Sequence, residues 1–172
     1  MGVCEMRNRI VLAIVLLFGL VGGSAAKDTA PVFKTAEAKH FSGVEGVELT
    51  PAFYDYFYAE LRSELTKSKL VSEVIGEGEA VENVDADRSV VITGTVTEYK
   101  KGSVAKSALI GFGAGMRSLK VDADVMRRSD QQNLCTIHVH VKVEPNWNEK
   151  IMARFAAQQI AKDMKKEFGP KR

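Results

Sequence analysis

Two histidines and two aspartates are the residues whose types and spacing best suit metal chemistry. His138 and His140 stand two positions apart in one segment, and Asp122 and Asp124 do so in another. Side chains two apart on a strand point to the same face. Imidazole nitrogens and carboxylate oxygens are common metal ligands. If the two strands pair, these four side chains are candidates for a metal site, or for a hydrolase face built on His138, His140 and Asp124.

The pairing register decides whether the four side chains meet. The register that clusters them also sets Lys120 opposite Lys142, and directly opposed like charges destabilise an antiparallel pair. Slipping the strands by two residues makes every charged pair complementary. We therefore expect the slipped register, a solvated outer face, and no metal or other cofactor. The pairs in that register are Lys120–Glu144, Asp122–Lys142, Asp124–His140 and Met126–His138.

The segments that carry these pairs alternate apolar and polar residues, which is typical of half-buried strands. Leu119–Met126 and Leu134–Glu144 flank a polar turn at 129–133, so they form a hairpin. Cys135 opens the inward-facing set of the second strand. A third strand is Ser89–Tyr99, with Val90, Ile92 and Val96 on one face and Val91, Thr93, Thr95, Thr97 and Tyr99 on the other.

Two amphipathic helices flank these strands. Thr50-Pro51 begins a helix that runs to about Lys69, because Thr caps free amides and Pro suits the first helical position. Asn146 and Glu149 form a capping box for a C-terminal helix. The buried stripe of that helix is Ile151, Met152, Phe155, Ala156, Ile160 and Met164. Shorter strands are expected at Phe33–Phe41 and Leu70–Ile75. The fold class is α/β (α+β), an antiparallel-rich mixed sheet with both helices packed on one face.

A glycine-rich segment lies between the strands Ser89–Tyr99 and Leu119–Met126. Its spacing matches neither a dinucleotide-binding nor a phosphate-loop motif. Small residues favour a tight crossover between two strands; a surface for self-association or membrane contact, and a ligand-binding loop, are the alternatives. Lysines and an arginine around the segment form a basic rim, read either as solvated side chains or as an anionic-surface contact. The candidate interaction residues are Leu109, Ile110, Gly111, Phe112, Gly113 and Gly115, and the rim is Lys100, Lys101, Lys106, Arg117 and Lys120.

Three stretches around this segment resemble a known family. They are Gly94-Thr-Val-Thr-Glu-Tyr-Lys-Lys-Gly102, Gly111-Phe-Gly-Ala-Gly115 and Leu119-Lys-Val-Asp-Ala-Asp-Val125. The chain is similar here to the bacterial domain of unknown function 4410 (DUF4410) family. The resemblance implies a small secreted or lipid-anchored envelope domain with a helix-on-sheet fold. It implies no activity or catalytic residue, since none is established for that family.

The N-terminus has the order of a secretory signal peptide. Arg7 and Arg9 precede an apolar run, Ile10–Val21, and small residues lead to a cleavage point after Ala26. The run is shorter than the roughly 20 residues of a membrane-spanning helix. We therefore expect residues 1–26 to be a cleavable signal and residues 27–172 to be one domain that works in the periplasm or outside the cell.

The composition of the chain and the absence of certain motifs argue against two classes of function, nucleic-acid binding and hydrolysis. The net charge is only +2 over 172 residues, which argues against nucleic acid as the main partner. Nucleophile-elbow and zinc-protease motifs are absent, and a buried Cys135 would be inert. We expect a non-catalytic envelope domain that binds or assembles, whose partner is an unknown envelope protein or a second copy, with peripheral membrane contact as a further mode. The alternative is the metal-binding or hydrolytic face described first.

Overall fold

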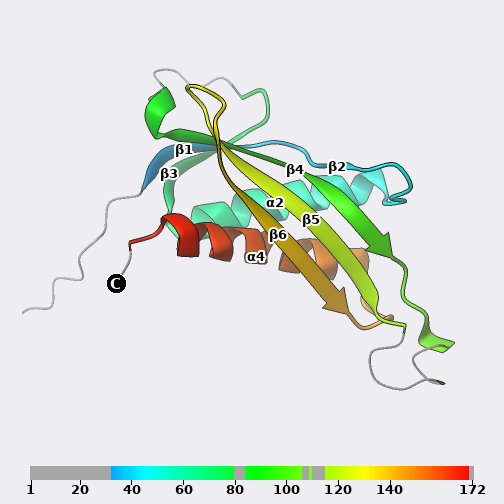
Figure 1. The fold of residues 1–172 in the computed structure, drawn as a ribbon. Coiled ribbons are helices and arrows are strands. Elements are labelled where there is room, and N and C mark those ends of the chain that lie inside the picture. Colours follow the sequence, from blue (N-terminus) through cyan, green and yellow to red (C-terminus); the bar gives the residue numbers. More distant parts are fainter. Residues whose placement is uncertain (1–31, 80–83, 106–108, 110–114, 171–172) are drawn as a thin grey trace, which may run out of the picture. The chain divides into compact units, whose positions relative to one another are not determined.

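The computed structural model describes residues 32–79, 84–105, 109 and 115–170, and the predicted signal peptide lies outside these residues. A six-stranded mixed sheet in the order β3-β1-β4-β5-β6, with β2 also paired to β4, forms its centre (Figure 1). This confirms the predicted fold class. The strands are β1 (Phe33–Ala38), β2 (Ser42–Gly43), β3 (Val71–Gly76), β4 (Ser89–Lys100), β5 (Arg117–Arg127) and β6 (Asn133–Val143), and the helical elements are α2 (Pro51–Ser68), η1 (Ala86–Arg88) and α4 (Glu149–Phe168).

The first half of the domain is a parallel β1–α2–β3 unit. The Thr50 side chain accepts a hydrogen bond from the Phe53 amide at 3.2 Å, and Pro51 occupies the first turn. The helix ends at Lys69, whose backbone is left-handed with φ 58°. β3 then returns parallel to β1, as a helical crossover requires. The predicted helix and both short strands are therefore confirmed.

The second half is an antiparallel β4–β5–β6 meander with one apolar face. Inward residues of all three strands stand opposite one another in rows, such as Val96, Val121 and Val139. A bulge between Val96 and Glu98 shifts the alternation of β4, since a bulge adds one residue to one strand. Tyr99 consequently stands opposite Leu119 on the inner face, and its hydroxyl donates to Glu149 at 3.1 Å. The expectation that Tyr99 shares a face with Val91, Thr93, Thr95 and Thr97 is wrong for this reason.

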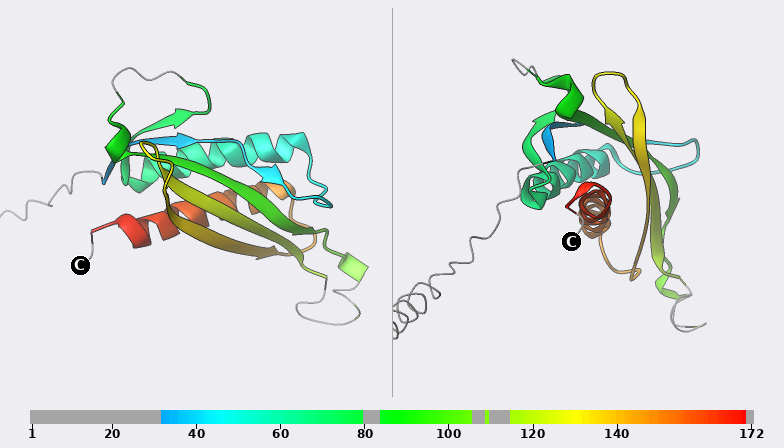
Figure 2. Two further views of the ribbon diagram at one scale, coloured as in Figure 1. Left: turned by 45° about the horizontal axis from the view of Figure 1, so that its top comes forward. Right: turned by 60° about the vertical axis from the view of Figure 1, so that its left-hand side comes forward.

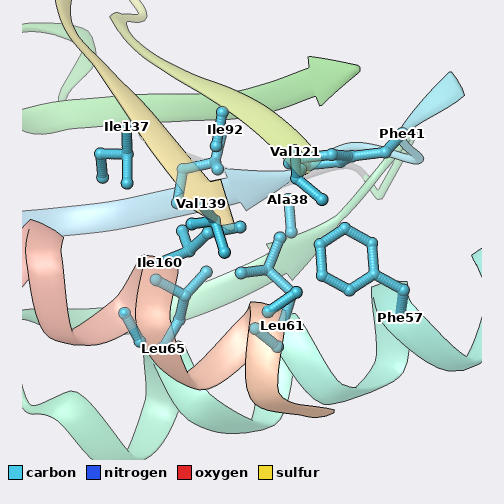
Figure 3. Close-up of a cluster of buried hydrophobic side chains, with 14 of the residues drawn as sticks. Ala38, Phe41, Phe57, Leu61, Leu65, Ile92, Val121, Ile137, Val139 and Ile160 are labelled. Carbon is cyan, nitrogen blue, oxygen red and sulfur yellow. The ribbon is translucent and has the colours of Figure 1, made fainter. Parts of the chain in front are cut away.

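Helices α2 and α4 cover the inner face of the sheet, and no helix of the described ranges lies on the opposite face of β4–β6 (Figure 2). The core lies between the two layers (Figure 3). Phe57 of α2 is 1% exposed and meets the Phe41 ring edge-on, with 5.0 Å between ring centroids. Burial of such side chains is the main source of stability in a domain with no internal disulfide. Around them lie Ala38, Leu61, Leu65, Ile92, Val121, Ile137, Val139 and Ile160.

The C-terminal helix differs from the prediction in its first residue and in its buried face, where Ile151 is only half-buried. Its N-cap is Asn148, whose side chain accepts from the Ile151 amide at 3.0 Å, and not Asn146. The preceding residues form a turn in which the Trp147 amide donates to the Glu144 carbonyl, so the helix begins later. Phe155 is 40% exposed and lies against Trp147 rather than in the core. The buried face also includes the small residues Ala153, Ala157 and Ala161.

Cys135 is only partly buried, which corrects its assignment to the core. It lies near the start of β6, beside a register irregularity at Val125 and Met126 of the paired strand. β6 ends the strand order, so no second strand covers it among the described residues. Further along β6, Ile137, Val139, Val141 and Val143 are buried as predicted.

A polar cluster joins the end of β1 to α2 and to the end of β3. The backbone amide of His40 donates to Glu77 Oε2 at 3.0 Å, and His40 Nδ1 lies 3.0 Å from the same oxygen. The imidazole stacks on Tyr58, whose hydroxyl accepts from the Glu77 amide. The amide of His40, followed by its side chain, lowers the pKa of the Glu77 carboxyl, because hydrogen bonds to a carboxylate favour its charged form.

We expect Phe57→Ala to lower the free energy of unfolding by about 3–5 kcal/mol, since it empties a fully buried aromatic site. The matched control is Phe155→Ala, which should cost roughly 1 kcal/mol because Phe155 is already partly exposed. Urea denaturation of both variants measures the difference. Equal losses would contradict the assignment of Phe57 to the core and Phe155 to the surface.

The lowered pKa of Glu77 predicts a pH-dependent contribution to stability. A carboxyl whose folded pKa lies below its unfolded value of about 4.3 stabilises the fold above that value, and the contribution is lost as the pH falls through the folded pKa. Glu77→Gln should therefore destabilise the protein at neutral pH and have no effect well below the ordinary carboxyl range. Urea unfolding across pH tests this, with the exposed Glu45→Gln as control; a loss independent of pH would contradict it.

Candidate functional site

The predicted interaction segment connects β4 to β5. These strands are antiparallel neighbours, so the segment is a hairpin connection and the expectation of a tight crossover is wrong. Its base is closed by a hydrogen bond from the Ser103 amide to the Gly115 carbonyl at 2.8 Å. Gly115 has φ 89°, a left-handed conformation that glycine adopts without strain. The two ends of the segment, at Ser103 and Gly115, therefore lie side by side at the end of the sheet.

Two apolar residues of this connection are strongly exposed. Leu109 is 85% exposed and Val104 is 65% exposed, the largest values among the large hydrophobic residues described. Of the other predicted interaction residues, Ile110, Gly111, Phe112 and Gly113 lie outside the described residues. Exposed apolar side chains close together on a surface are a feature of interaction sites.

The register of the β5–β6 hairpin differs from both registers considered for the sequence. Asp122 stands opposite His138, Lys120 opposite His140, and Asp124 opposite Thr136. The turn explains the difference. Gln131 adopts φ 57°, the Arg127 amide donates to the Gln132 carbonyl, and Arg127 pairs with Asp130 at 3.0 Å. This turn and the irregularity beside it slip the strands in the opposite direction from the one expected from charge pairing alone.

As a result, the two histidines and two aspartates have separate partners. His138 Nδ1 lies 2.7 Å from Asp122 Oδ1. Asp124 accepts hydrogen bonds from Thr136 and Asn133, and His140 has Lys120 as its cross-strand neighbour. Within the described ranges, no group of three or more His, Cys, Asp and Glu side chains is placed to hold a metal ion.

The same face is cationic at the end near the β4–β5 connection. Glu98 pairs with Lys120 at 3.0 Å and with Lys100 at 3.2 Å. These ammonium groups, Lys120 first, lower the pKa of the Glu98 carboxyl. Ser118 and Lys142 occupy the next row. The basic rim expected from the sequence contains Lys100 and Lys120, but the contribution of β6 to it was missed because the predicted register was wrong.

Two hollows lie along this part of the protein. One, of about 390 Å³, is lined from β4, β5 and β6 by Glu98, Lys100, Lys120 and Lys142 among others. The second, of about 530 Å³, follows β6 to α4, where Phe155, Gln158, Gln159 and Lys162 line it. His140 and Lys142 line both, so the hollows adjoin. The sequence does show one lysine on each of the three strands. That these lysines lie at the same end of the face follows only from the observed strand register.

Cys135 is the one cysteine of the described residues. Burial, with smaller contributions from Glu167 and Asp124, raises the pKa of its thiol. A raised pKa keeps the sulfur protonated and poorly nucleophilic. Its environment therefore differs from that of an activated catalytic cysteine.

Together the elements define a helix-on-sheet domain of the mixed α+β class. The chain belongs to the family described as Domain of unknown function (DUF4410), whose model matches residues 47–161. The resemblance seen in the sequence is thereby confirmed. No curated protein matches the chain, and no helix among the described residues is both long and apolar enough to cross a bilayer.

Several solved structures share the fold. PelC from Paraburkholderia phytofirmans, solved as a dodecamer, has a TM-score of 0.55 and 11% identity, covering 76% of this chain and 86% of its own. A point variant of the same PelC dodecamer has a TM-score of 0.54 and 9% identity over 76% and 85%. XCC0632 from Xanthomonas campestris has a TM-score of 0.50 and 11% identity over 80% and 85%. At these identities the likeness concerns the fold alone.

We expect zinc to leave the melting temperature of the purified protein unchanged. The hairpin register gives Asp122 and Asp124 different partners and offers two ligands, not three or four, at any one place. Thermal unfolding with and without zinc measures this, with His140→Ala as the comparison variant. A zinc-dependent rise that His140→Ala abolishes would restore the metal-site hypothesis.

Proposed function

We propose that this protein is an exported, non-catalytic domain of the cell envelope that works by assembly, with copies of itself or with an envelope protein. The observation that carries the proposal is the exposure of Leu109, which leaves 85% of a large apolar residue in contact with water. Val104 adds a second exposed apolar residue in the same connection. Burying such side chains in an interface is favourable by about 25 cal/mol per Å² of apolar surface.

Export is supported by the N-terminal sequence. The basic start, the apolar run and the small residues before Lys27 follow the order of a signal peptide. A periplasmic or secreted location fits a domain whose surface mixes both signs of charge.

The non-catalytic part of the proposal rests on what the candidate groups have as partners. The Cys135 thiol has a raised pKa. The hydroxyl residue in the row of the Asp122–His138 pair is Thr95, and Asp122 on the middle strand separates it from His138. A triad-type site needs a nucleophile within hydrogen-bond reach of its base. None of the described side chains in these rows completes that arrangement.

Self-association is the mode of assembly to test first. PelC, which shares the fold, was solved as a dodecamer. Rings of identical subunits use two different surfaces of each subunit in a head-to-tail contact. Lys100 and Ser118 are the last paired residues at this end of β4 and β5, and residues 101–105 continue beyond them, so this end of the sheet offers one such surface (Figure 1).

We expect the purified protein to form oligomers and Leu109→Asp to weaken their association by roughly tenfold or more, because a charge replaces an apolar contact. Analytical ultracentrifugation over a range of concentrations gives the dissociation constant. The control is Val32→Asp, which makes the same change at a 39% exposed residue next to β1.

Two further outcomes bear on the proposal. A protein that is monomeric, but is cross-linked in envelope extract to one partner that Leu109→Asp loses, supports assembly with another protein. A monomer that shows no such partner, or an oligomer indifferent to Leu109→Asp, contradicts it. Vesicle flotation that depends on Leu109 in the absence of any protein partner would replace assembly by peripheral membrane contact.

A further inference from the structure

Three strands bring their ammonium groups to one end of the uncovered sheet face. Cross-strand pairing sets Lys100 of β4, Ser118 of β5 and Lys142 of β6 in one row. Glu98 and Lys120, followed by His140, make the adjacent row. Neighbouring strands lie about 4.8 Å apart, so the backbone positions of Lys100 and Lys142 are about 10 Å apart with Ser118 between them. Flexible lysine side chains can converge on one molecule across that distance.

The residue between the two lysines in this row is a buried serine. Ser118 is 7% exposed, and its hydroxyl lies 3.5 Å from Glu98 Oε1. That separation is at the limit of a hydrogen bond, so the hydroxyl is held weakly and can turn to another acceptor. The hollow above it measures about 390 Å³, which suits a small molecule rather than a polymer chain.

The charges of this hollow are not balanced by the protein. Among the described residues that line it, Glu98 is the one acid, and its carboxylate is shared by Lys100 and Lys120. Lys142 forms no ion pair with any described residue. Like charges gathered on adjacent strands cost free energy, and a surface shaped only by solubility would intersperse acids among them. The other end of the same face does so, with Asp122 beside His138.

We propose that this hollow is a binding site for a small multivalent anion carrying phosphate or carboxylate groups. Lys100, Lys120 and Lys142 supply charge-assisted hydrogen bonds, and Ser118 supplies a neutral donor at the floor. A ligand with at least two anionic groups fits the separation of Lys100 and Lys142. The hollow adjoins the apolar connection, since Gly115 and Met116 also line it. The lysines of the site lie on the strands, so anion binding and assembly are tested by different variants and either can fail without the other.

The test is isothermal titration of the purified protein with inorganic tripolyphosphate and, separately, with citrate. We expect saturable binding at one site per chain that weakens as salt is added, because the contacts are between exposed charges. Lys142→Gln should weaken binding roughly fivefold, and the double variant Lys100→Gln with Lys142→Gln should abolish it. Both positions are exposed, so neither change disturbs the core.

The matched control is Lys165→Gln, which removes one exposed lysine from the last turn of α4. It should leave binding unchanged. If Lys142→Gln and Lys165→Gln lowered the affinity for the anion equally, net charge alone would explain the effect and the proposal would be wrong. Absence of saturable binding to both free anions would also overturn it, including the case in which only anionic phospholipid vesicles bind. Binding of tripolyphosphate without citrate supports the site and assigns it to phosphate.

Discussion

The burial of one sheet face under two helices is the interaction on which the other features depend. Phe57, Leu61 and Leu65 of α2 and Ile160 of α4 meet inward residues of the strands, and all four are 1% exposed or less. Those positions exclude water, so the inward residues of β5 from Leu119 to Val125 and of β6 from Ile137 to Val143 are apolar. The charged residues between them lie on the opposite face. The rows of charged side chains on the uncovered face are therefore a product of the core. A change of register would have to move in steps of two to keep both faces intact.

Because registers that differ by two residues keep the same faces, the strand register could not be predicted from the apolar pattern. Alternation placed Leu119, Val121, Ala123 and Val125 on the inner face, and all are buried. Alternation says nothing about which pair of inward residues stands opposite, and cross-strand charge pairs are worth only about 0.2–1 kcal/mol each. The left-handed Gln131 and the pairing of Arg127 with Asp130 set the turn instead. Local geometry of this kind depends on how a few residues fold back, which the apolar pattern does not encode.

The helices illustrate the same division. Thr50-Pro51 predicted the start of α2 correctly, since a cap and a proline act locally. Asn148 and Asn146 are equally suitable caps by residue type, and the intervening turn decided between them. Phe155 looked like a core residue by spacing, but α4 presents alanines there and leaves the ring beside Trp147. Tyr99 lies on the inner face because of a bulge in β4, and no residue type in β4 predicts that bulge. The fold class could be predicted from the pattern of apolar residues. The arrangement of the candidate sites depends on the bulge, the turns and the strand register, which that pattern does not predict.

Among the described strands β6 has a neighbour on one side only, and its other edge has a consequence for solubility. A long strand edge without a partner presents backbone amides and carbonyls that can recruit the edge of another chain and begin aggregation. β6 is 11 residues long, so its exposure is a hazard in a crowded compartment. Charged and ionisable side chains at alternate positions, His138, His140 and Lys142, oppose close approach by a second strand of the same kind, and α4 packs alongside. The polarity of this strand thus discourages indiscriminate pairing while the inward valines hold it in the sheet.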